Sequence, residues 1–363
     1  MSEIVDVAYK FGCGRYICGF DVLETVGGEV ARVAKKVFVV GGKTAISLTK
    51  GRLISGFEKA GIEYVFEEYN GFCAHKAARE YAEKALELGA DAIIGVGGGR
   101  AMDFSKLCGV YAKLPTYTVP TSLSTCAAFT TLSVIYDESG KTVGNYYLEE
   151  EVRGIFIDYG IMINQPVRLV AAGIMDALAK HIEIKNGHRE VDSASFNIDL
   201  VTASVLAKHT YETILANREE ACACIERHEF SRAVENIIFA CLPVTGMISG
   251  ISKGFGQSAL GHELYYQLRT KFTKEALSYL HGEVVAIGLL TQLVYNTEDE
   301  LVSPFAKMMS EMGMPTTLEG IGIERTDENF DLLYREMCRS NFVRDEKLFE
   351  KALKVIFNTN TEE

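Results

Sequence analysis

The sequence predicts an α/β domain built on a parallel sheet, followed by an all-α domain. The chain of 363 residues and 40.0 kDa is long for one hydrophobic core, which favours two domains. Short apolar runs alternate with helical patterns through roughly the first 160 residues. After Pro166 the apolar residues recur at the i, i+3, i+4 spacing of helices. We therefore expect the domains to cover residues 1–163 and 164–363.

Predicted strands and helices alternate in the first domain. The run KVFVVGG is rich in β-branched residues and ends in glycines, whereas HKAAREYAEKALELGA consists of strong helix formers. Such a succession predicts a parallel sheet with helices on its faces. The predicted strands are residues 36–42, 63–71, 91–99, 115–122 and 154–160, and the predicted helices are residues 75–90 and 100–113.

Residues 132–150 interrupt this alternation. Two extended runs there flank an Asp-Glu-Ser-Gly turn, which predicts a β-hairpin. Beyond Pro166, the segment VRLVAAGIMDALAKHIEIKNG and most of the remaining chain carry helical spacing, and strand-like runs almost vanish. The second domain is therefore expected to be helical.

Composition and charge exclude several classes of protein. Hydrophobic residues make up 48% and charged residues 24%, and the net charge of −12 disfavours nucleic acids and anionic membranes as partners. The N-terminus lacks the pattern of a signal peptide, and no uninterrupted apolar run has the length of a membrane span. The nine cysteines have no regular spacing, which fits a reducing compartment. We expect a cytoplasmic protein.

The stretch DAIIGVGGGRAMDFSK, residues 91–106, places three glycines between a predicted strand and a predicted helix. The dinucleotide pattern G-x-G-x-x-G does not fit, because Arg100 or Met102 occupies its last position. The geometry still offers backbone N–H groups and a helix dipole to an anion. A tight turn packed on a helix is the alternative. Three glycines in a row at the carboxyl end of a buried strand favour a phosphate site.

The loop after the first of these strands, VVGGKTA, bears on the choice of nucleotide. Enzymes that select NAD usually place a carboxylate there, on the ribose 2′-hydroxyl. This chain has Gly41, Gly42 and Lys43 instead. The absence of an acid and the presence of a lysine weakly favour NADP, or the use of both cofactors. The alternative is that Lys43 is an ordinary surface lysine.

Two histidines and an aspartate lie in apolar helical patterns of the second domain. His262 and His281 are too far apart in sequence to share one helix face, but two neighbouring helices can direct them to one point. Asp176 is a carboxylate in an apolar helix and needs a partner there. Two imidazoles, a carboxylate and an open position suit a catalytic Zn²⁺ or Fe²⁺. Taken singly, each histidine could be a hydrogen-bonded core residue and Asp176 a helix cap.

Four motifs follow one another along the chain: GVGGGRAMDFSK, PTSLSTCAAFTTLSVIYDESG, PVRLVAAGIMDALAKHIE and LHGEVVAIGLL. Their order resembles that in the glycerol dehydrogenases of the iron-containing (group III) alcohol dehydrogenase superfamily. The opening YKFGCGRY also matches, and the resemblance covers residues 8–295. It implies the fold shared with dehydroquinate synthase: a Rossmann-like N-terminal domain, a helical C-terminal domain and an active site between them.

The resemblance also implies a function and a set of site residues. The function is that of an NAD(P)(H) oxidoreductase which transfers hydride between nicotinamide and a small alcohol or carbonyl substrate. The metal ligands would be Asp176, His262 and His281, the same three residues that the chemistry of their side chains singles out. The cofactor-binding residues would be Gly42, Gly97, Gly98, Gly99, Arg100, Ala101, Thr121, Ser122, Thr130, Leu132 and Tyr136.

Lys180 marks a departure from the iron-dependent members, which have a histidine four residues after the aspartate. The chain therefore resembles the zinc-type branch with three ligands; zinc is the favoured metal, and iron, nickel and manganese are the alternatives. His181 is not expected to replace that histidine, because five residues along a helix turn it away from the ligand face.

Cys126 marks a departure from the glycerol dehydrogenases, which carry an aspartate there that contacts the substrate hydroxyls. A thiol cannot accept hydrogen bonds from a polyol as a carboxylate does, and it does not repel an anionic substrate. The segment TCAA resembles a hydroxycarboxylate dehydrogenase branch, which reduces 2-oxo acids. The alternatives are thus a glycerol dehydrogenase-like enzyme and a 2-hydroxycarboxylate dehydrogenase using NADPH, unless Cys126 merely packs.

The expected chemistry is metal-assisted hydride transfer. The metal acts as a Lewis acid on the substrate oxygen and the nicotinamide carries the redox change. A dehydroquinate synthase-like cyclase is a remote alternative, because few lysines and arginines lie near the motifs to hold a substrate phosphate. A nucleotide-binding protein without catalysis and a non-haem iron oxygenase fit less well. The family usually forms homo-oligomers, which we expect here by analogy.

Overall fold

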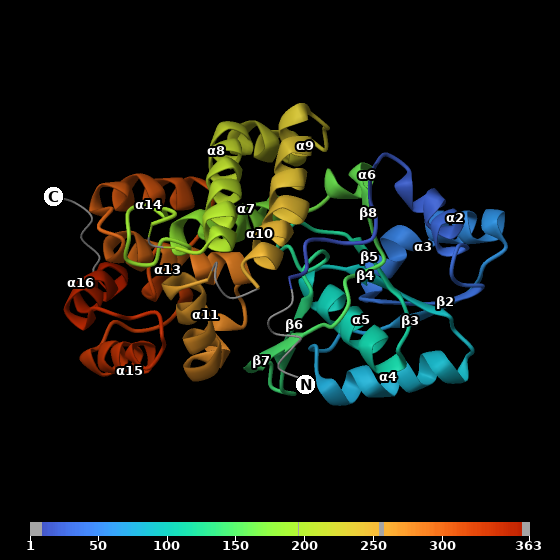
Figure 1. The fold of residues 1–363 in the computed structure, drawn as a ribbon, viewed down its shortest axis with the longest axis horizontal. Coiled ribbons are helices and arrows are strands. Elements are labelled where there is room, and N and C mark those ends of the chain that lie inside the picture. Colours follow the sequence, from blue (N-terminus) through green and yellow to red (C-terminus); the bar gives the residue numbers. More distant parts are fainter. Residues whose placement is uncertain (1–8, 195, 254–257, 358–363) are drawn as a thin grey trace.

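The structure, a computed structural model, describes residues 9–194, 196–253 and 258–357. An α/β part and a helical part lie side by side along the long axis of the molecule (Figure 1). All strands of the described residues precede Tyr159, and helices and loops follow it. The predicted parallel-sheet and helical parts are confirmed. The boundary between residues 163 and 164 stays a prediction.

Six strands form one parallel sheet in the order β1-β8-β5-β4-β2-β3. Strand β2 lies between β3 and β4, so the chain winds in one direction from β2 and in the other from β4. Sheets of this kind bind ligands at such a reversal, outside the carboxyl ends of the strands. The strands are β1 (Tyr16–Gly19), β2 (Lys36–Gly41), β3 (Glu63–Glu68), β4 (Ala92–Gly97), β5 (Thr116–Pro120) and β8 (Gly154–Asp158).

Helices cover both faces of this sheet. Val37 of β2 belongs to the same buried cluster as Phe57 of α3, whereas the next residue, Phe38, belongs to the cluster of Phe104 of α5. Alternate residues of a strand point to opposite faces, so a strand covered on both sides must be apolar throughout. This explains the near-continuous apolar runs of the sequence. The helical segments are η1 (Val22–Thr25), α2 (Val26–Val30), α3 (Lys43–Ala60), α4 (His75–Glu87) and α5 (Gly99–Ala112).

The predicted hairpin is present as β6 (Leu132–Tyr136) and β7 (Thr142–Tyr147), which pair antiparallel. It contacts α11 (Leu260–Lys271) of the helical part. Nη2 of Arg269 donates to the carbonyl of Gly140 at 2.7 Å, and Nδ2 of Asn145 donates to the hydroxyl of Tyr266 at 3.2 Å. The hairpin therefore links the two parts of the molecule.

Helix α7 (Val167–Glu183) lies at the centre of the helical part and packs against α8 and α13. Every residue from Val170 to Lys180 is buried. A helix buried on all sides explains its apolar sequence and makes its few charged residues notable. The other helical segments are α6 (Tyr159–Met162), α8 (Ile198–Glu226), α9 (Arg232–Phe239), η2 (Ala240–Val244), α10 (Thr245–Ile251), α12 (Thr273–Ala276), α13 (His281–Tyr295), η3 (Asp299–Leu301), α14 (Val302–Glu311), η4 (Glu319–Ile321), α15 (Asp327–Cys338) and α16 (Glu346–Phe357).

The largest buried cluster spans both parts of the chain. Leu123 and Phe129, after β5, and Ile155 of β8 join residues of α7, α11 and α13 in it. Within the described residues, the helical segment Arg232–Ile251 is long and apolar enough to cross a membrane by length and composition, and 61% of the most apolar stretch is buried inside the protein. A buried core helix can have the same length and the same apolar composition as a membrane span.

Candidate active site

The triple glycine lies where the sheet reverses its winding. Strand β4 ends at Gly97, whose φ of 144° is a conformation that side chains other than glycine rarely adopt. Gly41 ends the neighbouring strand β2, and a Cβ atom there would lie 2.1 Å from the carbonyl oxygen of Val96. The two glycine loops are therefore adjacent, and α5 starts directly behind the second. The first N–H groups of a helix lack partners within the helix, which is what an anion site uses.

Hydroxyl groups from the loop after β5 border this helix start. The N–H of Thr121 donates to the carbonyl of Gly97 at 2.9 Å. A Cβ atom on Gly98 would lie 3.1 Å from Oγ of Ser122, and one on Gly99 would lie 2.7 Å from Oγ1 of Thr125. Only glycine leaves the space between the helix start and these hydroxyls open. The structure thus brings Thr121 and Ser122 to the triple glycine.

The other predicted cofactor residues lie in three places. Gly42 is the N-cap of α3, and the side chains of Lys43 and Arg100 are exposed. The guanidinium of Arg100 lies over the ring of Phe72 at 5.4 Å. Ala101 is in the first turn of α5. The first strand of the hairpin, β6, begins with Leu132 and ends with Tyr136, and Thr130 lies just before it.

Lys106 holds that segment in place, a role that the sequence pattern does not indicate. Its side chain is fully buried, and Nζ donates to the carbonyls of Ala127, Thr130 and Leu132 at 2.7, 2.9 and 2.5 Å. Nζ also lies 3.1 Å from Oδ1 of Asp103, one turn earlier on α5. A lysine on the helix of the glycine loop thus fixes the predicted cofactor segment against that helix.

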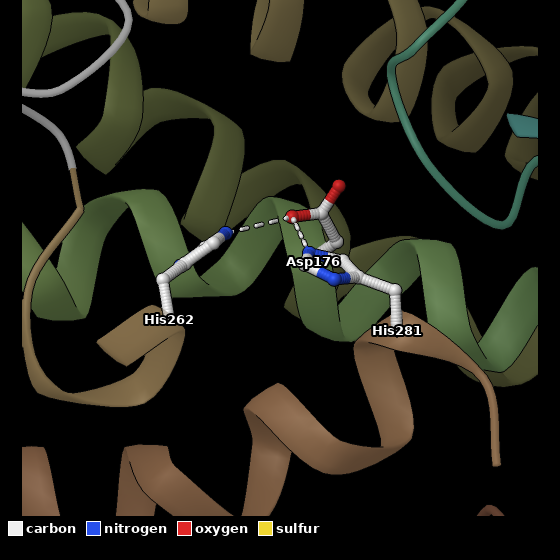
Figure 2. A group of neighbouring side chains, drawn as sticks. All are labelled: Asp176, His262 and His281. Atoms are coloured by element: carbon white, nitrogen blue, oxygen red, sulfur yellow. Dashed lines mark ion pairs between the residues drawn. The ribbon is translucent and has the colours of Figure 1, made fainter. Parts of the chain in front are cut away.

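Asp176, His262 and His281 converge in the helical part, from α7, α11 and α13. Figure 2 shows both rings directed toward the carboxylate. Oδ1 of Asp176 is 3.5 Å from Nε2 of His262 and 3.6 Å from Nε2 of His281, and the three potential ligand atoms lie within 4.8 Å of one another. Two imidazoles and one carboxylate converging this closely have the composition of a catalytic zinc site or a ferrous site. The structure therefore assembles the trio selected from the sequence.

Close contacts at glycines set this convergence. A Cβ atom on Gly282, next to His281, would lie 1.9 Å from the carbonyl oxygen of Ala172, so α13 touches the backbone of α7 one turn before Asp176. A Cβ atom on Gly173 would lie 1.7 Å from the carbonyl oxygen of Leu123. The loop after β5 therefore rests on α7 beside the carboxylate. These contacts carry no local sequence signal beyond the glycines themselves.

Glu183, two turns after Asp176 on α7, orients His262. Its Oε1 accepts hydrogen bonds from the backbone N–H groups of Ala259 and His262, both at 2.8 Å, and its Oε2 contacts Nδ1 of the same histidine. A carboxylate on Nδ1 leaves Nε2 as the atom that faces Asp176. Sequence reasoning missed this residue, although a signal exists: acidic residues seven apart in one apolar helix share a face.

Lys180 lies between Asp176 and Glu183 in the sequence of α7, and its side chain contacts Asp176 and His262. Its Nζ is 3.0 Å from Oδ1 of Asp176 and 3.2 Å from Nε2 of His262. Burial alone would raise the pKa of Asp176, but the charge of Lys180, followed by the close imidazoles of the two histidines, holds it well below its usual value. Burial alone would lower the pKa of Lys180, but Asp176 leads the charges that raise it. Both groups are therefore ionised.

His281 is held by its neighbours on both sides of the helix start. The ring of Tyr265 packs edge-on against it with centroids 4.3 Å apart. Arg168 makes an ion pair with Glu283 at 2.6 Å, and Oε2 of Glu283 accepts the N–H of Leu280 at 2.8 Å. Burial lowers the pKa of His281, so the ring is neutral and keeps a lone pair for a ligand.

Cys126 is buried in the same region, and His181 faces elsewhere. Burial, followed by the charge of Asp176, raises the pKa of the Cys126 thiol to about 12, so it is uncharged. The ring of His181 packs on Tyr211 of α8 with centroids 4.9 Å apart. This contact agrees with the expectation that its position on α7 turns it away from the ligand face.

Comparisons with known proteins identify the family to which the chain belongs. A family model described as iron-containing alcohol dehydrogenase matches residues 13–151. The chain is 30% identical to glycerol dehydrogenase of Escherichia coli O6:H1 over 86% of this chain and 84% of that protein. It is 26% identical to hydroxycarboxylate dehydrogenase A of Escherichia coli K12, over 78% and 76% of the two chains.

The fold agrees with these relationships. A probable glycerol dehydrogenase from Sinorhizobium meliloti superposes with a TM-score of 0.82 over 96% of this chain and 98% of that chain, at 23% identity. Both the shared sequence and the shared fold cover most of the chain. The chain therefore belongs to the iron-containing alcohol dehydrogenase family, as a glycerol dehydrogenase-like, metal-dependent and NAD-linked alcohol oxidoreductase.

Proposed function

We propose that Asp176, His262 and His281 hold one divalent cation and that the chain reduces small carbonyl compounds, or oxidises the corresponding alcohols, at this position. The observation that carries the proposal is the convergence of three potential ligand atoms within 4.8 Å. The carboxylate of Glu183 behind His262 supports it, because histidines that bind metals usually donate their second nitrogen to such a group. The residues present therefore fit a metal.

Zinc is the favoured ion in this proposal. Three protein ligands and one open position are typical of catalytic zinc, and the place of a fourth histidine is taken by Lys180. Iron remains the alternative, since two histidines and one carboxylate also bind Fe²⁺. When bound, either ion supplies a Lewis acid for the substrate oxygen. Glu183 orients one imidazole, and Tyr265 and the Arg168–Glu283 pair position the other.

The nicotinamide cofactor is proposed to place its diphosphate at Gly97, Gly98 and Gly99. The open space in front of α5, bordered by Ser122 and Thr125, supports this. Lys43 is exposed at the start of α3, next to Gly42, and no carboxylate of the loop stands beside it. We therefore keep the weak preference for NADP over NAD as part of the proposal.

Two substrate classes are compatible with this site. The glycerol dehydrogenase relatives favour polyols such as glycerol. The hydroxycarboxylate dehydrogenase relative favours 2-hydroxy acids, and one structural observation supports it: Cys126 is buried and uncharged beside Asp176. A side-by-side assay of 2-oxo acids, dihydroxyacetone and simple aldehydes with NADH and NADPH separates the two.

The ligand assignment is tested by replacing His262 with alanine. We expect zinc binding to be lost and turnover to fall by about 1,000-fold or more, while NAD(P)H binding persists. Metal analysis of the purified protein, calorimetry with NADH and steady-state kinetics measure the three quantities. His209→Ala, on an exposed position of α8, is the matched control. Full activity and zinc content in the His262 variant would refute the assignment.

A further inference from the structure

Lys180 is the one side-chain cation in direct contact with the candidate ligand atoms within the described residues. Only 3% of its side chain is exposed. Its Nζ contacts Oδ1 of Asp176 and Nε2 of His262, which are two of the three atoms proposed to hold the metal. The ammonium of Lys180 thus lies beside the atoms that are proposed to hold the metal cation.

A bound metal would change the partners of that ammonium. The lone pair of Nε2 of His262 can accept from one donor or bind one cation at a time, so metal ligation takes it from the N–H of Lys180. Two cations also repel each other when they share the same carboxylate oxygen. Because Lys180 is anchored in the buried helix α7, its ammonium stays close to the centre. It then has N–H donors to spare, and a buried charge without partners is costly.

The charges around the centre show what this partner must be. Asp176 and Glu183 are the two carboxylates that contact the trio, and Lys180 is the nearby cation. The charge of a divalent ion added to these groups leaves one positive charge in excess when both histidines are neutral. Cys126 adds no negative charge, because burial raises the pKa of its thiol. The loaded centre therefore favours a substrate with one negative charge.

We propose that Lys180 is a specificity-determining residue that pairs with the carboxylate of a 2-oxo acid, or of the 2-hydroxy acid formed from it. In such a substrate the reacting oxygen and the carboxylate lie on adjacent carbons. Nζ of Lys180 is similarly close to two candidate ligand atoms, at 3.0 Å from Oδ1 of Asp176 and 3.2 Å from Nε2 of His262. This inference rests on the proposed function and names the substrate class of the same site.

The experiment compares two substrates of equal carbon number, pyruvate and the uncharged hydroxyacetone, in zinc-loaded protein. Lys180→Met removes the charge and keeps most of the length. We expect the ratio of kcat/KM for pyruvate to that for hydroxyacetone to fall by about 30-fold, mainly through a higher KM for pyruvate, since hydrogen bonds to charged groups are strong. Lys208→Met, an exposed lysine of α8, should leave the ratio unchanged. An unchanged ratio in the Lys180 variant overturns the inference.

Two measurements keep the inference testable independently of catalysis. Zinc affinity of the metal-free protein, measured by calorimetry, should be equal or higher in Lys180→Met, because the competing ammonium is gone. If the variant does not fold, wild-type protein loaded with zinc and NADH is titrated with oxamate and with its uncharged analogue oxamide. We expect oxamate to bind at least about tenfold more tightly. Equal affinities contradict the role of Lys180.

The outcome also separates this inference from the proposed function. A wild-type enzyme that reduces hydroxyacetone but prefers it to pyruvate overturns the carboxylate role and leaves metal-assisted carbonyl reduction intact. A zinc-loaded wild-type protein that reduces neither compound, nor any other carbonyl substrate, overturns the proposed function itself.

Discussion

The two parts of the molecule form their halves of the site in opposite ways. In the α/β part, consecutive backbone positions at the end of β4 leave open the space proposed for the diphosphate, and side chains are absent from it. In the helical part, side chains from α7, α11 and α13 meet at one point, and the backbone only brings the helices together. The first arrangement depends on residues that are neighbours in the sequence; the second depends on tertiary packing.

This contrast predicts that substitutions should affect one ligand and spare the other. A Cβ atom in the glycine loop should lower the affinity for the nucleotide and leave the affinity for the metal unchanged. A changed side chain behind a histidine should lower the affinity for the metal and leave the affinity for the nucleotide unchanged. Metal affinity and nucleotide affinity, measured separately, therefore test whether the two parts act independently.

The largest effect is expected for Gly99→Val. The new side chain would enter the space in front of α5, where even a Cβ atom lies 2.7 Å from Oγ1 of Thr125. We expect NADH affinity to fall by about 100-fold with zinc content unchanged, as measured by calorimetry and metal analysis. Gly51→Val, at a helix position of α3 where a Cβ atom meets nothing within 4 Å, is the control. Equal NADH affinity in both variants would show that the loop does not hold the diphosphate.

An intermediate effect is expected for Glu183→Gln, which keeps the shape of the side chain but removes the charge behind His262. Carboxylates in this position typically contribute about 10- to 100-fold to metal affinity. Zinc affinity should fall by this amount, and NADH affinity should not change. Glu226→Gln, at an exposed position near the end of α8, serves as the control. Loss of NADH binding in the Glu183 variant would mean that the two parts are not independent.

The smallest effect is expected for His181→Gln and concerns stability alone. Burial, followed by the charges of Lys185 and Lys208, lowers the pKa of His181 from 6.5 to about 4. Because the unfolded chain binds a proton between these pH values and the folded chain does not, this contribution to stability is complete above pH 6.5 and is lost as the pH falls toward 4.

The glutamine variant should therefore lose less stability than the wild type on acidification. We expect the fall in Tm between pH 7 and pH 5 to be smaller by about 1–3 °C, as measured by calorimetric melting. His209→Gln, exposed on α8, should behave as the wild type. Identical pH dependence in all three proteins would contradict the role assigned to the half-buried ring of His181.

The same contrast explains what could be predicted from the sequence. Strand β4, the glycine turn and α5 form one continuous segment, so their local pattern was sufficient. Asp176, His262 and His281 could be selected because charged and imidazole groups are unusual in apolar helices. Their roles as ligands, the cofactor contacts and the domain boundary stay predictions.

The residues that support the site could not be predicted in the same way. From the sequence, Lys180 indicates only the loss of a fourth ligand, whereas in the structure its ammonium contacts two of the ligand atoms. Glu183 and Lys106 act through partners that are distant in the sequence, such as His262 and the carbonyl of Thr130. A pattern along one helix shows which residues share a face, but it does not show what packs against that face.

The hairpin of β6 and β7 has a consequence for recombining this protein with its relatives. It belongs to the first half of the chain but is hydrogen-bonded to α11, the helix that carries His262. A chimera joined near residue 163 would combine a hairpin from one parent with a helix from the other. Domain exchange between such enzymes should therefore transplant the hairpin and α11 as one unit, even though more than a hundred residues of chain separate them.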